Sequence, residues 1–351
     1  MRSLDQPLVY VLTPVYNGEK YLSECIASVL AQNYANWEYC ILNNHSTDSS
    51  RVIAEAYAQR DRRIRVLDTP QFCNHLTSQN FGLRQMPADA QYCKIVHADD
   101  WLFADCLTQM VGLAEAHPTV AIVGAYGLRN DHVSWDGLPY GRSAIPGRDI
   151  CRNTLFGGTY VFGSPTSLLF RAEPVRQRPA FFNESNPHAD VEVCFDILRS
   201  GDFGFVHQVL TFTRDHSESG THYTRRIGSD YLGMFEILLK YGRAFLTESE
   251  YDGRLKDNWN QYYAFLGATV ASGSFDKSFR HFHRRGLNRL GCSLNPARLA
   301  TAVLLQVIDL VLNPLTTSKR ITRRLTRLLG NTSIRAGNRW RFTSGLRAWL
   351  L

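Results

Sequence analysis

The sequence lacks three patterns that would indicate other classes of protein. Its eight cysteines form no Cys-x-x-Cys pair, which argues against a zinc site or a disulfide framework and favours reduced, buried thiols. Its first residues form no apolar signal-peptide core, so we expect a cytoplasmic protein rather than a secreted one. The apolar stretch 299–312 is too short to span a bilayer, which takes about 20 apolar residues.

Acidic residues are also scarce in the C-terminal part of the chain. Residues 280–351 hold 14 Lys or Arg and one acid, Asp309, whereas the rest of the chain holds 25 basic and 31 acidic residues. The formal net charge of +7 therefore combines an acidic body with a basic tail. Within that tail, apolar residues alternate with arginines at helical spacing, namely Arg320, Arg323, Arg324 and Arg327.

This pattern is typical of an amphipathic helix at a membrane surface, or of a helix packed on protein. We expect the tail, residues 296–351, to bind an anionic membrane surface and to hold the protein on the inner face of the plasma membrane. Nucleic-acid binding is not expected, because no recognition motif accompanies the basic residues. An oligomer remains possible, with the aromatic-rich segment 230–290 or the stretch 299–312 as the interface.

The first third of the chain alternates between two periodicities. Short apolar runs typical of buried strands occupy residues 8–12, 37–42, 64–67, 92–96 and 120–125. Helical patterns lie between them, at residues 21–32, 48–59, 76–86 and 102–116. This alternation predicts an α/β fold with a mostly parallel sheet and helices on both faces. Gly and Pro interrupt the pattern over 130–182, after which we expect a helix at 190–200 and a strand at 203–206.

Two adjacent carboxylates are the most informative feature. Asp99 and Asp100 directly follow the apolar strand 92–96, where open α/β sheets bind their ligands. Two neighbouring negative charges need a compensating cation, and Mg²⁺ uses one or two carboxylates together with phosphate oxygens. An Asp-Asp helix cap is the simpler alternative. The segments that follow other strands, 13–18 and 43–48, should reach the same edge and favour a nucleotide diphosphate site.

Taken together, these motifs resemble the family 2 inverting glycosyltransferases with a GT-A fold. The residues that carry the resemblance are Thr-Pro-Val-Tyr-Asn-Gly-Glu-x-Tyr-Leu, Ser-Val-Leu-x-Gln-x-Tyr-x-Asn-Trp-Glu, Ser-Thr-Asp and Asp-Asp, in the usual order over about 8–220. The resemblance implies a GT-A domain over 1–225, with a nucleotide half at about 1–128 and an acceptor half at about 129–225. A helical extension, 226–295, and the basic tail would follow.

The resemblance also assigns roles to individual residues. Pro14, Tyr16, Asn44, Asn80, Asp99 and Arg214 would bind the nucleotide sugar, and Asp100 and His216 would hold Mn²⁺ or Mg²⁺. Asp190 falls where the family has its general base, which takes the proton of the acceptor hydroxyl as this attacks the anomeric carbon from the face opposite the leaving diphosphate. The segment Ser164-Pro165-Thr166-Ser167 either borders the acceptor or is a simple turn.

The chain departs from the family pattern at several positions. Asn43, Asn44 and His45 stand where Asp-Asp-Gly is usual, and His97 replaces the first Asp of Asp-x-Asp-Asp. An Asn oxygen can still accept from a base N–H, but the Asn brings a donor and removes a charge, which weakens the inference of uracil. Ala189 replaces a common Glu before the general base, so Glu192 is considered as a substitute.

We therefore expect a metal-dependent transferase of the hexosyl or N-acetylhexosaminyl type. It would move a sugar from a nucleoside diphosphate, with UDP favoured, to a glycan or lipid-linked glycan in surface polysaccharide synthesis. Two alternatives stay open. A nucleotidyltransferase would want a basic Gly-rich loop after the first strand, which is absent from residues 13–18. A non-catalytic scaffold is favoured by Asn43 and Asn44 and disfavoured by Asp99, Asp100 and Asp190.

Overall fold

The computed structural model describes residues 6–216, 224 and 227–313. The chain forms two compact units, residues 1–222 and 223–351. Among the described residues, all eight cysteines are free thiols. No helix in these ranges combines the length and the apolar character that crossing a bilayer would take.

The first unit is built on a ten-stranded sheet whose main strand order is β3-β2-β1-β4-β9-β6-β10-β5. Its strands are β1 Val9–Val15, β2 Trp37–Asn43, β3 Ile64–Asp68, β4 Tyr92–Ile95, β5 Trp101–Leu102, β6 Val120–Arg129, β7 His132–Ser134, β8 Ala144–Ile145, β9 Leu168–Arg171 and β10 Asp202–Thr213. β7 pairs with β6, and β8 pairs with β10.

The sheet is mixed but mostly parallel at the edge that matters for the site. β3, β2, β1 and β4 are parallel neighbours, and β6 is parallel to β10. Only β9 runs antiparallel between β4 and β6, and the short strands β5, β7 and β8 are antiparallel to their partners. The predicted α/β fold is confirmed, and the loops after β1, β2 and β4 meet at one edge of the sheet.

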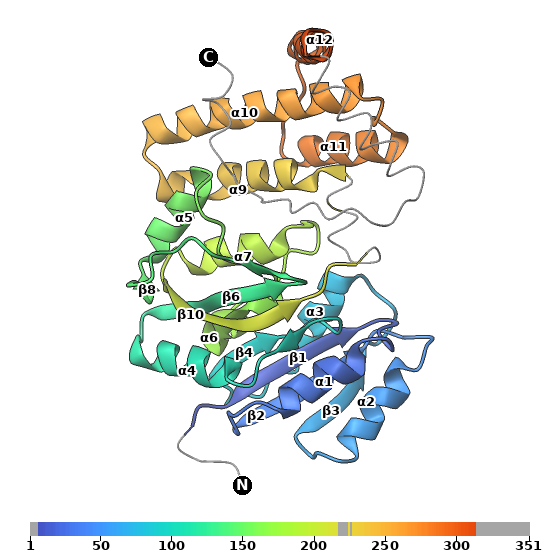
Figure 1. Cartoon of the computed structure of the whole chain (residues 1–351), viewed down its shortest axis with the longest axis vertical. Coiled ribbons are helices and arrows are strands. Elements are labelled where there is room, and N and C mark those ends of the chain that lie inside the picture. Colours follow the sequence, from blue (N-terminus) through green and yellow to red (C-terminus); the bar gives the residue numbers. More distant parts are fainter. Residues whose placement is uncertain (1–5, 217–223, 225–226, 314–351) are drawn as a thin grey trace. The chain divides into compact units, whose positions relative to one another are not determined.

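Helices cover both faces of this sheet (Figure 1). Val9 and Val11 of β1 point into a core shared with α1, α2 and α4, whereas Tyr10, between them, donates its hydroxyl to the carbonyl of Gly82 in α3. This alternation is the period of two that a strand covered on both faces requires. The helices of this unit are α1 Leu22–Leu30, α2 Ser50–Ala58, α3 His75–Leu83, α4 Cys106–Ala116, α5 Gly147–Leu155, α6 Ala172–Arg176 and α7 Ala189–Ile197.

Two expectations about this unit were wrong in detail. The helix expected from Leu102 begins only at Cys106, because Trp101 and Leu102 form β5 against β10. Trp101 stacks on Phe212 with ring centroids 3.6 Å apart, a long-range contact that helical periodicity cannot reveal. The break expected over 130–182 also contains a regular helix, α5, whose apolar residues Ile150, Cys151 and Leu155 are buried.

The second unit consists of helices around its own apolar cluster. These are α9 Ser229–Phe245, α10 Glu248–Ala271, α11 Lys277–Arg289 and α12 Pro296–Leu312. A capping box between Thr247 and Glu250 begins α10, and the Asp276 side chain caps α11. None of the residues of α12 is buried. The predicted amphipathic arginine helix at 320–329 lies outside the described residues.

Candidate active site

The loops after β1 and β2 are joined by side chain to backbone hydrogen bonds. Asn17 accepts from the Thr47 N–H at 2.8 Å, and the Asn17 N–H donates to the Ser46 hydroxyl at 3.0 Å. The Ser49 N–H donates to the Glu19 carboxylate at 2.9 Å. Asn17 has a φ of +49°, which Asn tolerates better than most residues. These polar residues therefore shape the first two loops.

Asn44, predicted to bind the nucleotide base, uses its side chain to hold the next loop. Its Nδ2 donates to the Cys73 carbonyl at 2.7 Å. Its Oδ1 accepts from the Thr69 hydroxyl at 3.0 Å and from the Cys73 N–H at 3.1 Å. With only 5% of Asn44 exposed, these contacts occupy its amide group. The geometry thus gives Asn44 a positioning task in the loop after β3.

Tyr16 and Phe72 form an exposed aromatic pair at this edge. Their ring centroids are 4.9 Å apart, and the two residues are 51% and 59% exposed. Tyr16 follows β1, where a nucleotide contact was predicted, and Pro14 lies two residues before it, paired with Leu42 of β2. Phe72 was not predicted, although an aromatic residue in a loop after a parallel strand would have been a usable signal. Exposed aromatic faces are suited to stacking on a base.

Asn80 also has a structural role. Its Nδ2 donates to the Phe182 carbonyl at 2.8 Å and its Oδ1 accepts from the Phe182 N–H at 2.8 Å, while Glu184 accepts a further bond from Nδ2 at 3.0 Å. Asn80 is 1% exposed. Because both ends of its amide bind the 182–184 segment, Asn80 fixes α3 to the loop that precedes α7.

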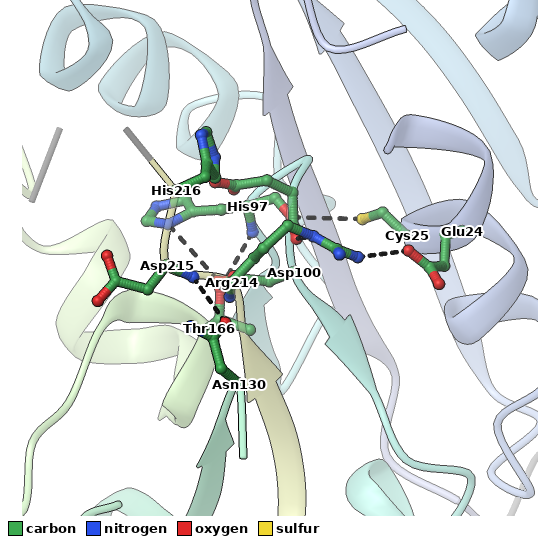
Figure 2. Close-up of polar contacts among 10 residues, drawn as sticks. Glu24, Cys25, His97, Asp100, Asn130, Thr166, Arg214, Asp215 and His216 are labelled. Carbon is green, nitrogen blue, oxygen red and sulfur yellow. Dashed lines mark hydrogen bonds and ion pairs between the residues drawn. The ribbon is translucent and has the colours of Figure 1, made fainter. Parts of the chain in front are cut away.

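Asp100 lies beneath the edge of the sheet, with both carboxylate oxygens engaged (Figure 2). Oδ2 accepts from the Thr166 hydroxyl at 2.6 Å, and Oδ1 accepts from the Arg214 N–H at 3.0 Å. Asp100 is 2% exposed. Burial raises the pKa of this carboxyl to about 6, against the partly opposing effect of the nearby His97. Asp100 thus ties β10 and the 165–167 turn to the loop after β4.

Lys94 supports Thr166 from the core side. Its ammonium group is completely buried and donates to the carbonyls of Thr166 at 2.7 Å and Leu168 at 3.1 Å. Burial lowers the pKa of Lys94, and the nearby thiols of Cys106 and Cys93 and the carboxyl of Asp100 act in the opposite direction. The Thr166 hydroxyl also accepts from the His97 N–H at 3.1 Å. The buried Lys94 side chain therefore fixes the turn whose hydroxyl holds Asp100.

Asp99 is the more accessible of the two carboxylates. Its Oδ2 lies 3.0 Å from His216 Nε2, and the two side chains are 33% and 23% exposed. Arg214 donates from Nε to the Asp99 carbonyl at 3.2 Å, bonds to Glu24 and lies 4.1 Å from the ring centroid of Tyr21. Figure 2 shows Arg214 reaching Glu24. Arg214 and His216 are thus brought to Asp99 across more than 100 residues.

Asp190 lies in the first turn of α7, whose N-cap is His188. Its Oδ1 accepts from the Val191 N–H at 2.9 Å. The surrounding protein removes water from this partly exposed carboxyl and raises its pKa, while the nearby His188 and His97 act in the opposite direction. Glu192, considered as a substitute, is buried and accepts from Asn183 at 3.0 Å and Asn186 at 2.8 Å, so it braces the loop before α7.

The N-terminal part of the chain matches a known family. Residues 10–177 match the model described as glycosyl transferase family 2. GlyG of Streptococcus pneumoniae serotype 4, a glycosyltransferase, is 30% identical over 144 residues, which are 41% of this chain and 46% of that protein. TuaG of Bacillus subtilis, described as a putative teichuronic acid biosynthesis glycosyltransferase, is 28% identical over 153 residues, 43% of this chain and 60% of that protein. The matches thus span about half of these relatives.

Solved structures share the fold at low sequence identity. S. aureus TarS 1–349 in complex with UDP superposes with a TM-score of 0.57 at 15% identity, covering 80% of this chain and 78% of that chain. The mannosyltransferase PcManGT from Pyrobaculum calidifontis, in complex with GDP-Man and Mn²⁺, gives a TM-score of 0.50 at 16% identity, covering 88% and 89% of the two chains. Residues 10–177 match the family model, and the mixed α/β sheet that contains them has the fold of these structures. The N-terminal domain therefore belongs to glycosyl transferase family 2 and has the GT-A fold.

Proposed function

We propose that this protein transfers a sugar from a nucleoside diphosphate to a hydroxyl of a glycan or lipid-linked glycan, in the synthesis of a surface polysaccharide. The observation that carries this proposal is the pairing of Asp99 with His216, 3.0 Å apart, beside Arg214. The TuaG relative supports polysaccharide synthesis, and UDP in TarS supports a UDP-sugar donor. The nucleotide half would be about 1–128 and the acceptor half about 129–225.

The exposed rings of Tyr16 and Phe72 would hold the nucleotide base. They present flat apolar surfaces at the same edge of the sheet as Asp99. The Asn44 amide is engaged by Thr69 and Cys73, so the base contacts would come from the loop that Asn44 holds in shape. Backbone groups of this loop would then select the base. The appropriate assay is therefore a panel of donors with different bases.

Asp99 and His216 fit a divalent metal better than Asp100 does. Both are partly exposed and offer one carboxylate and one imidazole, whereas both oxygens of Asp100 already accept hydrogen bonds from the chain. Among the described residues no group of three or more His, Cys, Asp or Glu side chains is arranged to hold a metal ion. Mn²⁺ or Mg²⁺ held by two protein ligands takes its other ligands from phosphate oxygens and water. When bound, it would neutralise charge on the leaving diphosphate.

Asp190 would act as the general base. A carboxylate with a raised pKa accepts a proton more readily. Removal of water raises the pKa of Asp190, and its side chain stays partly exposed. It would take the proton of the acceptor hydroxyl while the hydroxyl oxygen bonds to the anomeric carbon and the bond to the diphosphate breaks. Attack from the face opposite the leaving group inverts the anomeric configuration. Glu192 holds Asn183 and Asn186 and so keeps the start of α7 in place.

The helix α12 supports the proposed membrane contact of residues 296–351. Six large apolar residues of this helix are exposed, namely Leu304, Leu305, Val307, Ile308, Val311 and Leu312. Residues 280–351 carry 14 basic residues and one acid, which complements an anionic surface.

We expect the double variant Leu304→Asp/Val311→Asp to float less with phosphatidylglycerol vesicles than wild type. Val52→Asp, at another exposed apolar position, is the control. Equal flotation of all three would contradict the contact.

The transferase is tested by release of nucleoside diphosphate from a panel of nucleotide sugars with Mn²⁺. We expect one donor to be hydrolysed, and the rate to fall by at least a hundredfold in Asp99→Asn. Asp89→Asn changes an exposed carboxylate on the same unit and should match wild type.

The catalytically altered scaffold is the second candidate, favoured by Asn43 and Asn44. Metal-dependent nucleotide binding without any turnover across the panel would support the scaffold function instead of the transferase function.

A further inference from the structure

Trp135 has an unusual backbone conformation for a large side chain. Among the described residues, four that are not glycine have a positive φ, namely Asn17, His45, Asn130 and Trp135. Asn and His are the residues that tolerate this region best, whereas a bulky residue at φ +66° is strained. Strain of this kind persists where surrounding contacts impose it, and it is concentrated at functional sites. The contacts of the indole are therefore informative.

Two separate segments, β6 and residues 160–163, contact the Trp135 indole and form its seat. A Cβ atom on Gly127 would lie 2.7 Å from Trp135 Nε1, and a Cβ atom on Gly163 would lie 2.9 Å from Trp135 Cε2. Only glycine at these two positions leaves room for the ring. The Tyr160 ring lies edge-on with its centroid 5.9 Å from that of Trp135, and the Tyr160 hydroxyl donates to the Gly163 carbonyl at 3.3 Å.

This seat adjoins the loop that carries the two carboxylates. The Cβ position of Gly163 is 2.7 Å from Ser167 Oγ, and Ser167 follows Thr166, whose hydroxyl donates to Asp100. The Cβ position of Gly127 is 3.1 Å from Thr211 Oγ1, and Thr211 pairs with Leu102, two residues after Asp100. Trp135 therefore lies at the β6 and β7 side of Asp100, whereas the aromatic pair Tyr16 and Phe72 follows β1 and β3.

Buried hydroxyl groups lie next to the two glycines that contact the indole. Ser167 is 1% exposed and Thr211 is fully buried, and within the described part of the chain neither hydroxyl has a hydrogen-bond partner. Buried polar groups are normally satisfied, so two such groups at one place indicate a partner supplied from outside the chain. The hydroxyls of Ser164 and Thr213, close to the same two residues in sequence, are unpartnered as well.

We propose that Trp135 forms a subsite for a neutral pyranose ring of the acceptor. An indole offers a flat apolar surface to the C–H face of a sugar, and nearby hydroxyls offer hydrogen bonds to the sugar hydroxyls. The residues that contact the indole, Gly127, Tyr160 and Gly163, carry no charge, which favours a neutral sugar over an anionic one. This subsite rests on the proposed transferase function.

The test is saturation-transfer NMR on the full-length protein with the methyl β-pyranosides of glucose, galactose, mannose and N-acetylglucosamine. We expect wild type to bind at least one of them, Trp135→Ala to weaken that binding by at least tenfold, and Trp135→Phe to retain part of it. Val133→Ala, at an exposed position of β7, is the matched control and should bind as wild type does. UDP, which is expected to bind at the proposed donor site and not at Trp135, serves as the check that each variant is folded.

Two results would overturn this proposal. One is wild-type protein that binds none of the four pyranosides, and the other is Trp135→Ala that binds them as tightly as wild type. A residue that merely fills space in the hairpin would change the midpoint of unfolding without changing sugar binding. In the kinetic assay, Trp135→Ala should raise the KM for the pyranoside at least tenfold, whereas Val133→Ala should have the KM of wild type. If no donor is hydrolysed by wild type, the transferase function fails, while the NMR result still decides the sugar subsite.

Discussion

Thr166 and Asp100, 66 residues apart in sequence, are joined by a 2.6 Å hydrogen bond between the hydroxyl and Oδ2 of the carboxylate. Both residues are buried, and Lys94 fixes the backbone carbonyl of Thr166 from below. The bond therefore links the turn before β9 to the loop after β4. Asp99 directly precedes Asp100 in that loop, so the position of Asp99 depends on a contact between two buried side chains.

Removing the Thr166 hydroxyl should loosen this loop. Thr166→Val keeps the shape of the side chain but leaves Asp100 Oδ2 buried without its donor, which costs about 1–3 kcal/mol. Urea unfolding should show this loss of free energy, and nucleoside diphosphate release should fall as well. Thr119→Val, at an exposed position before β6, is the control. An unchanged unfolding midpoint for Thr166→Val would show that the bond contributes nothing.

Restoring the residue usual in the family should weaken the fold at Asn44. In Asn44→Asp, a carboxylate oxygen replaces Nδ2 and faces the Cys73 carbonyl oxygen, now 2.7 Å from Nδ2. Because the site is buried, we expect a loss of about 2–3 kcal/mol in the free energy of unfolding. The measurement is urea unfolding at neutral pH. Asn288→Asp, exposed on α11, should change little. A more stable Asn44→Asp protein would contradict the role given to Asn44.

Asp100 should make the stability depend on pH. Burial raises its pKa to about 6 from the ordinary 3.8, so between these values the folded state binds more protons than the unfolded state. Its contribution to stability is fully present below pH 3.8 and is lost as the pH rises through about 6. The amide of the Asp100→Asn variant does not titrate. We therefore expect the unfolding free energy of this variant, measured in EDTA, to rise relative to that of wild type as the pH increases across this window. A pH-independent difference would contradict the raised pKa.

The local pattern of the sequence predicts much of the sheet but not the partners of its polar side chains. β1, β2 and β4 are apolar runs between polar loops, and their order along the chain already implies that the following loops share one edge. The amide of Asn80, in contrast, bonds to Phe182, 102 residues away, and nothing at position 80 reveals that. For the same reason, sequence could not show that Trp101 stacks on Phe212 and starts β5 where a helix was expected.

The two carboxylates illustrate the same limit at the site itself. The spacing indicates that Asp99 and Asp100 adjoin a ligand, but adjacent residues in a loop point in different directions. Burial of Asp100 against Thr166 and Arg214 directs it into the protein, and only the three-dimensional arrangement leaves Asp99 facing His216. The resemblance to the family predicted roles for both residues, whereas the structure distinguishes a partly exposed carboxylate, Asp99, from a buried one, Asp100.

We propose that Asp99 and His216 hold a metal that binds the donor diphosphate. The most direct test is calorimetric titration of UDP with and without Mn²⁺, on wild type and on His216→Ala. We expect Mn²⁺ to tighten UDP binding to wild type at least tenfold and to have no such effect on His216→Ala. UDP affinity that is the same with and without Mn²⁺ in wild type, or the same Mn²⁺ effect in both proteins, would contradict it.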